Sequence, residues 1–185
     1  FSGGMNLTFA TLGTLVKYPW PSSECNARGK SKFNCFESEF EIFDVLFSEL
    51  GLKRADGTYR RHPLSFLMEA ADDVCYALLD LQDAFELGIV ALEEMKPIFQ
   101  ALCGDDLADA IYDDAGLHGI RKVTKAVAIS INNLVNHCMV TFEAQLDTLV
   151  GDAQPKDLIS CFSDELLKRG LDAAKRIGYE KIFNE

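Results

Sequence analysis

The sequence predicts an all-α fold, and three features of the chain support that prediction. Apolar residues recur at spacings of three and four along most of the 185 residues, which is the period of a helix that buries one face. Strand signals are scarce, because no run of alternating apolar and polar residues is bounded by a hairpin turn. Helix-breaking residues, such as Gly151 and Pro155, separate the periodic segments. We therefore expect a single all-α unit.

The first half of the chain contains three predicted helices. The first covers residues 5–16 and is stopped by the two prolines that follow it. After a polar loop, a second helix over residues 38–50 repeats phenylalanine at helical spacing until Gly51 ends it. The third and longest helix runs from Pro63, a residue well suited to a first helical position, to Gly88 at its C-terminal cap.

The second half of the chain is predicted to be helical as well. Shorter helices are expected near residues 90–102 and 105–114, followed by a long core-crossing helix over roughly 118–149. After a break, two further helices near 156–168 and 170–182 complete the predicted fold.

Composition and charge exclude several classes of protein. The chain is 48% hydrophobic and 25% charged, which is typical of a globular protein. Its net charge of −11 argues against a nonspecific DNA clamp. It has no run of 18 apolar residues, so no membrane partner or membrane span is predicted. Because the chain begins at Phe1 without an initiator methionine or a signal peptide, we expect its start to be a cut within a longer protein.

The cysteine spacing predicts free thiols and no zinc site. No two cysteines form a C-x-x-C pair, and their separations match no small disulfide scaffold. We interpret them as buried thiols of a protein in the reducing cytoplasm. The six are Cys25, Cys35, Cys75, Cys103, Cys138 and Cys161.

The acidic charge is concentrated in residues 62–95, which contain eight carboxylates and no lysine or arginine. On a helical projection at about 100° per residue, five of these carboxylates and one tyrosine occupy a single stripe roughly 100° wide. A solvated polar face is one interpretation, and a site for a metal ion or a cationic partner is the other. The residues of the stripe are Glu69, Asp72, Asp73, Tyr76, Asp80 and Asp83.

Several motifs, all in one order, resemble a known family. They read Lys17-Tyr18-Pro19, Lys32-Phe33, Phe36-Glu37-Ser38-Glu39, Glu49-Leu50-Gly51-Leu52, Arg61-His62-Pro63-Leu64, Glu69-Ala70-Ala71-Asp72-Asp73-Val74-Cys75-Tyr76 and Asp80-Leu81-Gln82-Asp83-Ala84. Together they resemble the bacterial HD-domain deoxyguanosinetriphosphate triphosphohydrolases (dGTPases), specifically over residues 5–90. The resemblance implies a partial HD-domain-type helical bundle. Residues 1–90 would form the C-terminal part of the metal- and nucleotide-binding core, and residues 91–185 a helical region packed on it.

The resemblance also implies an activity and its cofactor. Members of the family hydrolyse a deoxynucleoside triphosphate to a deoxynucleoside and inorganic triphosphate, with a divalent metal ion such as Mg²⁺ or Mn²⁺. Carried over residue by residue, the metal ligand is Asp72, the ring against the sugar is Tyr76, and the acceptor for the 3′-hydroxyl is Asp80. These positions are i, i+4 and i+8 of one helix, so they share a face.

A second set of residues is expected to meet the substrate's phosphates. By the same resemblance, Lys17 and Tyr18 approach the phosphates and sugar, and Lys32 reaches phosphate, with Lys30 as the alternative to Lys32. A triphosphate carries several negative charges, which need cations near them.

The catalytic residues are not expected in this chain. The family's metal site also uses a His and a His-Asp pair, whereas no His-Asp dipeptide occurs here. We therefore expect the remaining ligands and the catalytic histidine upstream of Phe1, and we interpret His62 as structural and His137 as a core or interface residue.

Two other functions stay open at this stage. One is an HD-superfamily phosphohydrolase that acts on another phosphorylated substrate, and the other is a noncatalytic helical module that binds a nucleotide or a partner. The resemblance further implies a homo-oligomer, commonly a hexamer, and regulation by a nucleotide or single-stranded DNA.

Overall fold

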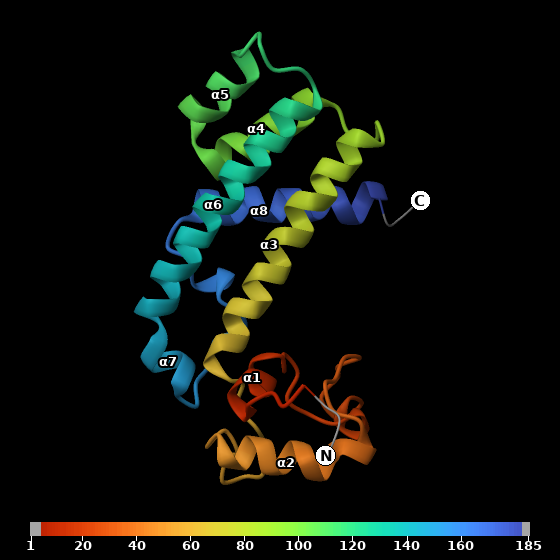
Figure 1. Cartoon of the computed structure of the whole chain (residues 1–185), viewed down its shortest axis with the longest axis vertical. Helices are drawn as coiled ribbons and strands as arrows, with labels where there is room; N and C mark the ends of the chain where they lie inside the picture. Colours follow the sequence, from red (N-terminus) through yellow and green to blue (C-terminus); the bar gives the residue numbers. More distant parts are fainter. Residues whose placement is uncertain (1–4, 183–185) are drawn as a thin grey trace. The chain divides into compact units, whose positions relative to one another are not determined.

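The computed structural model describes residues 5–182, and its regular elements there are helices (Figure 1). Within this range no β-strand forms, and only two isolated bridges occur. The predicted all-α fold class is therefore confirmed. The α-helices are α1 (Phe9–Thr14), α2 (Phe40–Glu49), α3 (Pro63–Glu86), α4 (Leu92–Cys103), α5 (Asp105–Asp113), α6 (Ile120–Ala144), α7 (Leu146–Val150) and α8 (Glu165–Ile177). Short 3₁₀ turns cover Ser22–Glu24, Glu37–Glu39 and Ile159–Cys161, and a π turn covers Gly178–Ile182.

The chain divides into two compact units, which we describe separately. The first contains the chain up to Glu69 and the segment Ala144–Asp157. The second contains Ala70–Glu143 and the chain from Leu158 onward. The predicted boundary after residue 90 stays a prediction.

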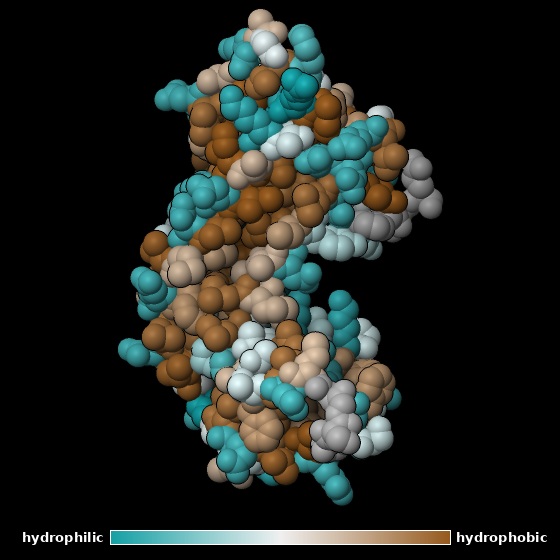
Figure 2. Space-filling view, in the orientation of Figure 1, coloured by the Kyte–Doolittle hydropathy of each residue, from teal (hydrophilic) through white to brown (hydrophobic). Residues whose placement is uncertain are grey.

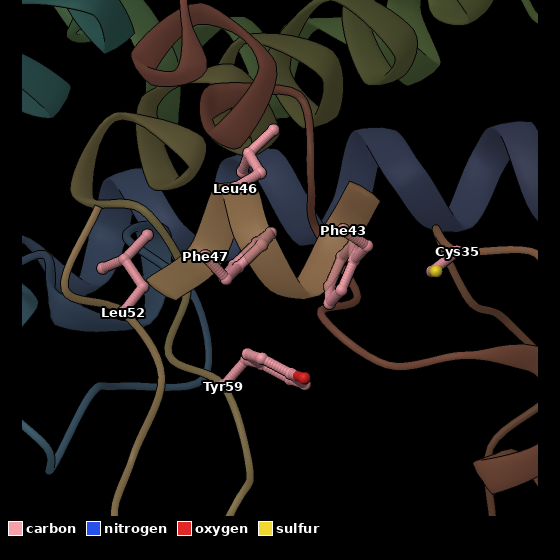
Figure 3. Close-up of a cluster of buried hydrophobic side chains, with 6 residues drawn as sticks. All are labelled: Cys35, Phe43, Leu46, Phe47, Leu52 and Tyr59. Atoms are coloured by element: carbon pink, nitrogen blue, oxygen red, sulfur yellow. The ribbon is translucent and has the colours of Figure 1, made fainter. Parts of the chain in front are cut away.

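The first unit is built around an aromatic cluster on α2 (Figure 3). The rings of Phe43 and Phe47 stack with centroids 4.3 Å apart, and the Tyr59 ring meets Phe43 edge-on at 5.1 Å. The Tyr59 hydroxyl donates to the Asp44 carboxylate at 2.6 Å, and burial together with this carboxylate raises the pKa of Tyr59. The phenylalanine spacing thus correctly predicted a buried helix face. The buried cluster comprises Cys35, Phe43, Leu46, Phe47, Leu52 and Tyr59.

The second unit packs α4 against α8 at a glycine. A Cβ atom added at Gly170 would lie 2.9 Å from the Leu102 side chain and 2.9 Å from that of Ala101. Only a residue without a side chain lets the two helices approach this closely. Leu102 and Leu171 are fully buried near this crossing.

The two predicted C-terminal helices, residues 156–168 and 170–182, are wrong in their boundaries. Ile159–Cys161 forms a single 3₁₀ turn, and α8 runs without interruption through the predicted break. Asp164 starts α8 because its carboxylate accepts from the backbone N–H groups of Leu166 and Leu167 at 2.9 and 3.0 Å. The glycine at position 170 serves the contact with α4 and does not end a helix. The predicted helix over 118–149 is likewise divided into α6 and α7.

The thiols are only partly buried. All six cysteines are free, but only Cys35 and Cys138 are buried, and Cys75 is exposed. Burial raises the pKa of the Cys138 thiol to about 11. The prediction of free thiols is correct, whereas the prediction that Cys75 is buried is wrong because it lies on the exposed side of α3.

Apolar side chains are also exposed on the helices of the second unit, where Figure 2 shows brown surface over α3 and α6. Leu79 on α3 is 48% exposed, and Met139 and Val140 on α6 are 49% and 69% exposed. None of the helices within residues 5–182 is long and apolar enough to cross a membrane.

Candidate functional site

The predicted metal- and sugar-binding residues all lie on α3, in the second unit. Asp72, Tyr76 and Asp80 occupy successive turns of this continuous helix and share one face. Asp72 is exposed, and Tyr76 is 59% exposed. This face therefore presents a carboxylate, a phenol ring and a second carboxylate within about 12 Å of helix length.

The Asp80 side chain is less exposed to water than those of Asp72 and Tyr76. It is half-buried, and burial together with the nearby Asp83 carboxylate raises its pKa. The backbone at Gly178 lies beside it, where an added Cβ atom would be 3.4 Å from the Asp80 Oδ2 atom. A carboxylate that has lost part of its hydration gains from a hydroxyl donor, which is the chemistry predicted for this position.

The acidic stripe has cationic partners supplied by distant segments. Of the eight carboxylates in residues 62–95, three have a cationic partner among the described residues, and two of these three belong to the stripe. Most of these partners lie far away in the sequence, so the charge pattern of residues 62–95 does not reveal them. Lysine or arginine nitrogen atoms lie 2.6–3.1 Å from these carboxylates. The pairs are Glu69 with Lys17 and Arg61, Asp73 with Lys175, and Glu94 with Lys181.

Glu69 holds the most buried of these charges, and it belongs to the first unit. It is 8% exposed, and its carboxylate oxygens lie 2.7 Å from Arg61 Nη2 and 3.1 Å from Lys17 Nζ. The Arg61 guanidinium also lies over the Phe66 ring, 3.9 Å from its centroid. We call Lys17, Arg61 and Glu69 the Glu69 network. Sequence reasoning assigned no role to Glu69 or Arg61, although both belong to the motifs that carry the resemblance.

The two segments that carry the predicted phosphate-contacting residues are joined by hydrogen bonds in the first unit. The Tyr18 backbone N–H donates to the Asn34 side chain at 2.7 Å, and the Trp20 indole donates to the Lys32 carbonyl at 2.8 Å. These bonds tie the segment that contains Lys17 and Tyr18 to the segment that contains Lys32. Lys17 Nζ lies 5.7 Å from the centre of the Tyr18 ring, and the Lys32 side chain is exposed.

His62 has a local structural role. Its Nδ1 atom accepts from the backbone N–H of Leu64 at 3.3 Å, in the first turn of α3, and lies 3.4 Å from the Thr14 hydroxyl. Burial lowers the pKa of His62, which favours the neutral ring that such an acceptor requires. His137 packs beside Phe162, with ring centroids 6.0 Å apart.

A metal site cannot be completed from the described part of the chain. Within residues 5–182 no group of three His, Cys, Asp or Glu side chains lies close enough together to hold an ion. Asp72 thus stays a predicted single ligand. Lys17, Tyr18 and Lys32 belong to the first unit and Asp72, Tyr76 and Asp80 to the second, so their joint action stays a prediction as well.

The all-helical fold of residues 5–182 is consistent with a partial HD-domain-type helical bundle. A deoxyguanosinetriphosphate triphosphohydrolase-like protein of Pseudomonas aeruginosa is 37% identical over 190 residues, which covers all of this chain and 42% of the relative. A protein of the same description from Synechocystis is 35% identical over 160 residues, covering 80% of this chain and 35% of the relative.

A deoxyguanosinetriphosphate triphosphohydrolase of Serratia proteamaculans is 32% identical over 127 residues, covering 64% of this chain and 24% of the relative. No protein-family model matches the chain. The chain belongs to the dGTPase-like family and corresponds to a portion of its members. The resemblance read from the motifs is thereby confirmed, and the chain spans less than half the length of these relatives.

Proposed function

We propose that this chain is part of a metal-dependent deoxynucleoside triphosphate triphosphohydrolase. The reaction releases a deoxynucleoside and inorganic triphosphate from a dGTP-like substrate. The observation that carries the proposal is the α3 face, where Asp72, Tyr76 and the partly dehydrated Asp80 follow one another at single-turn spacing. Relatives that match the chain are described as dGTPases or dGTPase-like proteins.

Asp72 is proposed as the ligand that this chain gives to a divalent metal ion. It is exposed on α3, and its oxygen atoms are the donors that Mg²⁺ and Mn²⁺ prefer. Its neighbour Asp73 is held by Lys175 at 2.9 Å, so we assign the metal to the more exposed Asp72 of the pair. When bound, such a metal ion polarises a phosphoryl oxygen. The remaining ligands and the catalytic groups are proposed to come from outside this chain.

Tyr76 and Asp80 are proposed to recognise the deoxyribose. The exposed Tyr76 ring offers a flat apolar face to the sugar and disfavours a 2′-hydroxyl sterically. Asp80 accepts a hydrogen bond from the 3′-hydroxyl, and a sugar without that group would leave this half-buried carboxylate unpaired.

Lys17, Tyr18 and Lys32 are proposed to contact the phosphates. The hydrogen bonds of Asn34 and Trp20 hold the two segments that carry them. The ammonium groups counter the charge of the triphosphate and stabilise the charge that develops on its oxygens. Glu69 positions the Lys17 ammonium through their ion pair of 3.1 Å.

The experiment is product analysis with the full-length protein, dGTP and Mn²⁺ or Mg²⁺. We expect deoxyguanosine and inorganic triphosphate in equal amounts, and release of orthophosphate or pyrophosphate instead would overturn the reaction. Asp72→Asn should abolish turnover, whereas the matched variant Glu93→Gln, at an exposed carboxylate of α4, should retain it. Activity retained by Asp72→Asn would remove Asp72 from the metal site.

The proposal includes a homo-oligomer, with a hexamer as the expected form, located in the cytoplasm. The exposed apolar side chains of α3 and α6 support burial against another copy, and the six free cysteines suit a reducing compartment. Light scattering coupled to size-exclusion chromatography tests the oligomer, with and without a deoxynucleotide or single-stranded DNA as effector. A monomer under all three conditions contradicts it.

A further inference from the structure

A basic pocket lies in the first unit, and none of its residues was assigned to the substrate. Its volume is about 420 Å³, which is within the range of small-molecule sites. Three cationic side chains and two carboxylates line it. The lining residues are Lys53, Arg54, Ala55, Asp56, Arg60 and Asp152.

The two arginines of the pocket are held in place by main-chain oxygens. Each guanidinium donates through its terminal nitrogens to carbonyl groups at 2.5–3.1 Å. Carbonyls fix the position of a guanidinium without cancelling its charge, so the pocket is a preorganised cationic surface. The acceptors are the carbonyls of Tyr59 and Asp152 for Arg54, and of Gly51 and Val150 for Arg60.

The Nε atom of each arginine lies near one loosely held carboxylate oxygen. Asp152 Oδ1 lies 3.3 Å from Arg54 Nε and 3.7 Å from Arg60 Nε. The Asp152 side chain is 78% exposed, so these contacts are screened by water and weak. Arg60 Nε is buried and has no hydrogen-bond partner among the described residues. A buried donor without a partner is costly, and a stronger acceptor at this position would relieve that cost.

The two arginines of the pocket favour an anion that can contact both of them. The Asp56 carboxylate is engaged in hydrogen bonds within its own turn, because it accepts from the Thr58 N–H at 2.9 Å and from the Thr58 hydroxyl at 2.6 Å. Lys53 is held in an ion pair with Asp44 at 2.6 Å. When the exposed Asp152 side chain rotates into solvent, Arg54 and Arg60 are therefore the cations left to the ligand, and Asp56 is the one carboxylate that remains in the lining. Arginine side chains match the geometry of phosphate oxygens.

We propose that this pocket binds a small molecule that carries two or more phosphate groups, and that Asp152 occupies the place of a phosphate oxygen until the ligand displaces it. The short lining, six residues from two segments, favours a small phosphorylated molecule over the backbone of a nucleic acid, which follows an extended groove.

The test is calorimetric titration of the protein with inorganic pyrophosphate, in low salt and EDTA, in a Lys32→Gln background, which removes a proposed phosphate contact at an exposed side chain outside the Glu69 network. We expect saturable binding that falls about tenfold in Arg60→Gln, because a charge-assisted bond is lost, and falls in Arg54→Gln for the same reason. Lys156→Gln, at a side chain that is 92% exposed, is the matched control and should bind normally.

The Asp152→Asn variant gives the sharper result, because it should bind pyrophosphate severalfold more tightly than the protein that retains Asp152. A gain in affinity cannot arise from a misfolded variant. Asp147→Asn, which removes an exposed carboxylate outside the pocket, should leave affinity unchanged. Weaker binding by Asp152→Asn, normal binding by both Arg60→Gln and Arg54→Gln, or binding of a single-stranded oligonucleotide that pyrophosphate does not displace would each overturn the proposal.

Discussion

Replacement of Glu69 should destabilise the protein strongly, although it removes only one charge. Glu69 is 8% exposed, and the side chains of its partners Arg61 and Lys17 are 12% and 23% exposed. Without the carboxylate, two cations remain close together with little water to hydrate them. Removing one member of a buried ion pair costs about 3–5 kcal/mol. Glu69→Gln preserves the size of the side chain, so its effect reports the charge and not a cavity.

Thermal unfolding followed by circular dichroism measures this cost. A loss of about 3 kcal/mol corresponds to a decrease in melting temperature on the order of 10 °C for a chain of this size. The matched control is Asp73→Asn, since the Asp73–Lys175 pair is more exposed, at 28% and 37%, and such pairs contribute about 1 kcal/mol or less. Equal melting temperatures for Glu69→Gln and Asp73→Asn would refute the reasoning.

A second substitution separates charge repulsion from loss of structure. In a Glu69→Gln background, Lys17→Met removes one of the two cations and should recover part of the lost stability. The same Lys17→Met change in the unsubstituted protein should be destabilising, because it leaves Glu69 with a single partner. Additive losses in the double variant would show that the Glu69 network does not couple these charges.

Three further predictions concern the second unit. Because the pKa of Asp80 is raised in the fold, its ionisation costs stability at pH values above that pKa, and the cost disappears as the pH falls below the unfolded value. Asp80→Asn should therefore raise the melting temperature at pH 7 but not at pH 3. Gly170→Ala should lower the free energy of unfolding by about 1–3 kcal/mol through overpacking against α4. Gly178→Ala should leave it unchanged, because an added Cβ atom there has its nearest contact at 3.4 Å. Chemical denaturation measures both values. The exposed Cys75 should react with a thiol reagent at pH 8 long before the buried Cys138, whose pKa is about 11, and equal rates measured by mass spectrometry would contradict this.

The features that could be predicted from the sequence are those with a local cause. The repeat of Phe43 and Phe47 identified the buried face of α2, and the i, i+4, i+8 spacing placed Asp72, Tyr76 and Asp80 on one face of α3. Both follow from helix geometry, which depends only on distance along the chain. Gly170 shows the limit of this reasoning, because a glycine that ends a helix and a glycine that admits a neighbouring helix are the same letter.

By itself, therefore, the sequence determined the helical class, the family resemblance and the position of the acidic stripe. The tertiary structure decided which carboxylates of that stripe are neutralised. Lys175 reaches Asp73 across 102 positions, and Asp152 lies 98 positions from Arg54. Coulomb energy depends on distance in space and on exclusion of water. Neither quantity can be obtained from the order of residues alone, because both depend on how the folded chain is arranged in space.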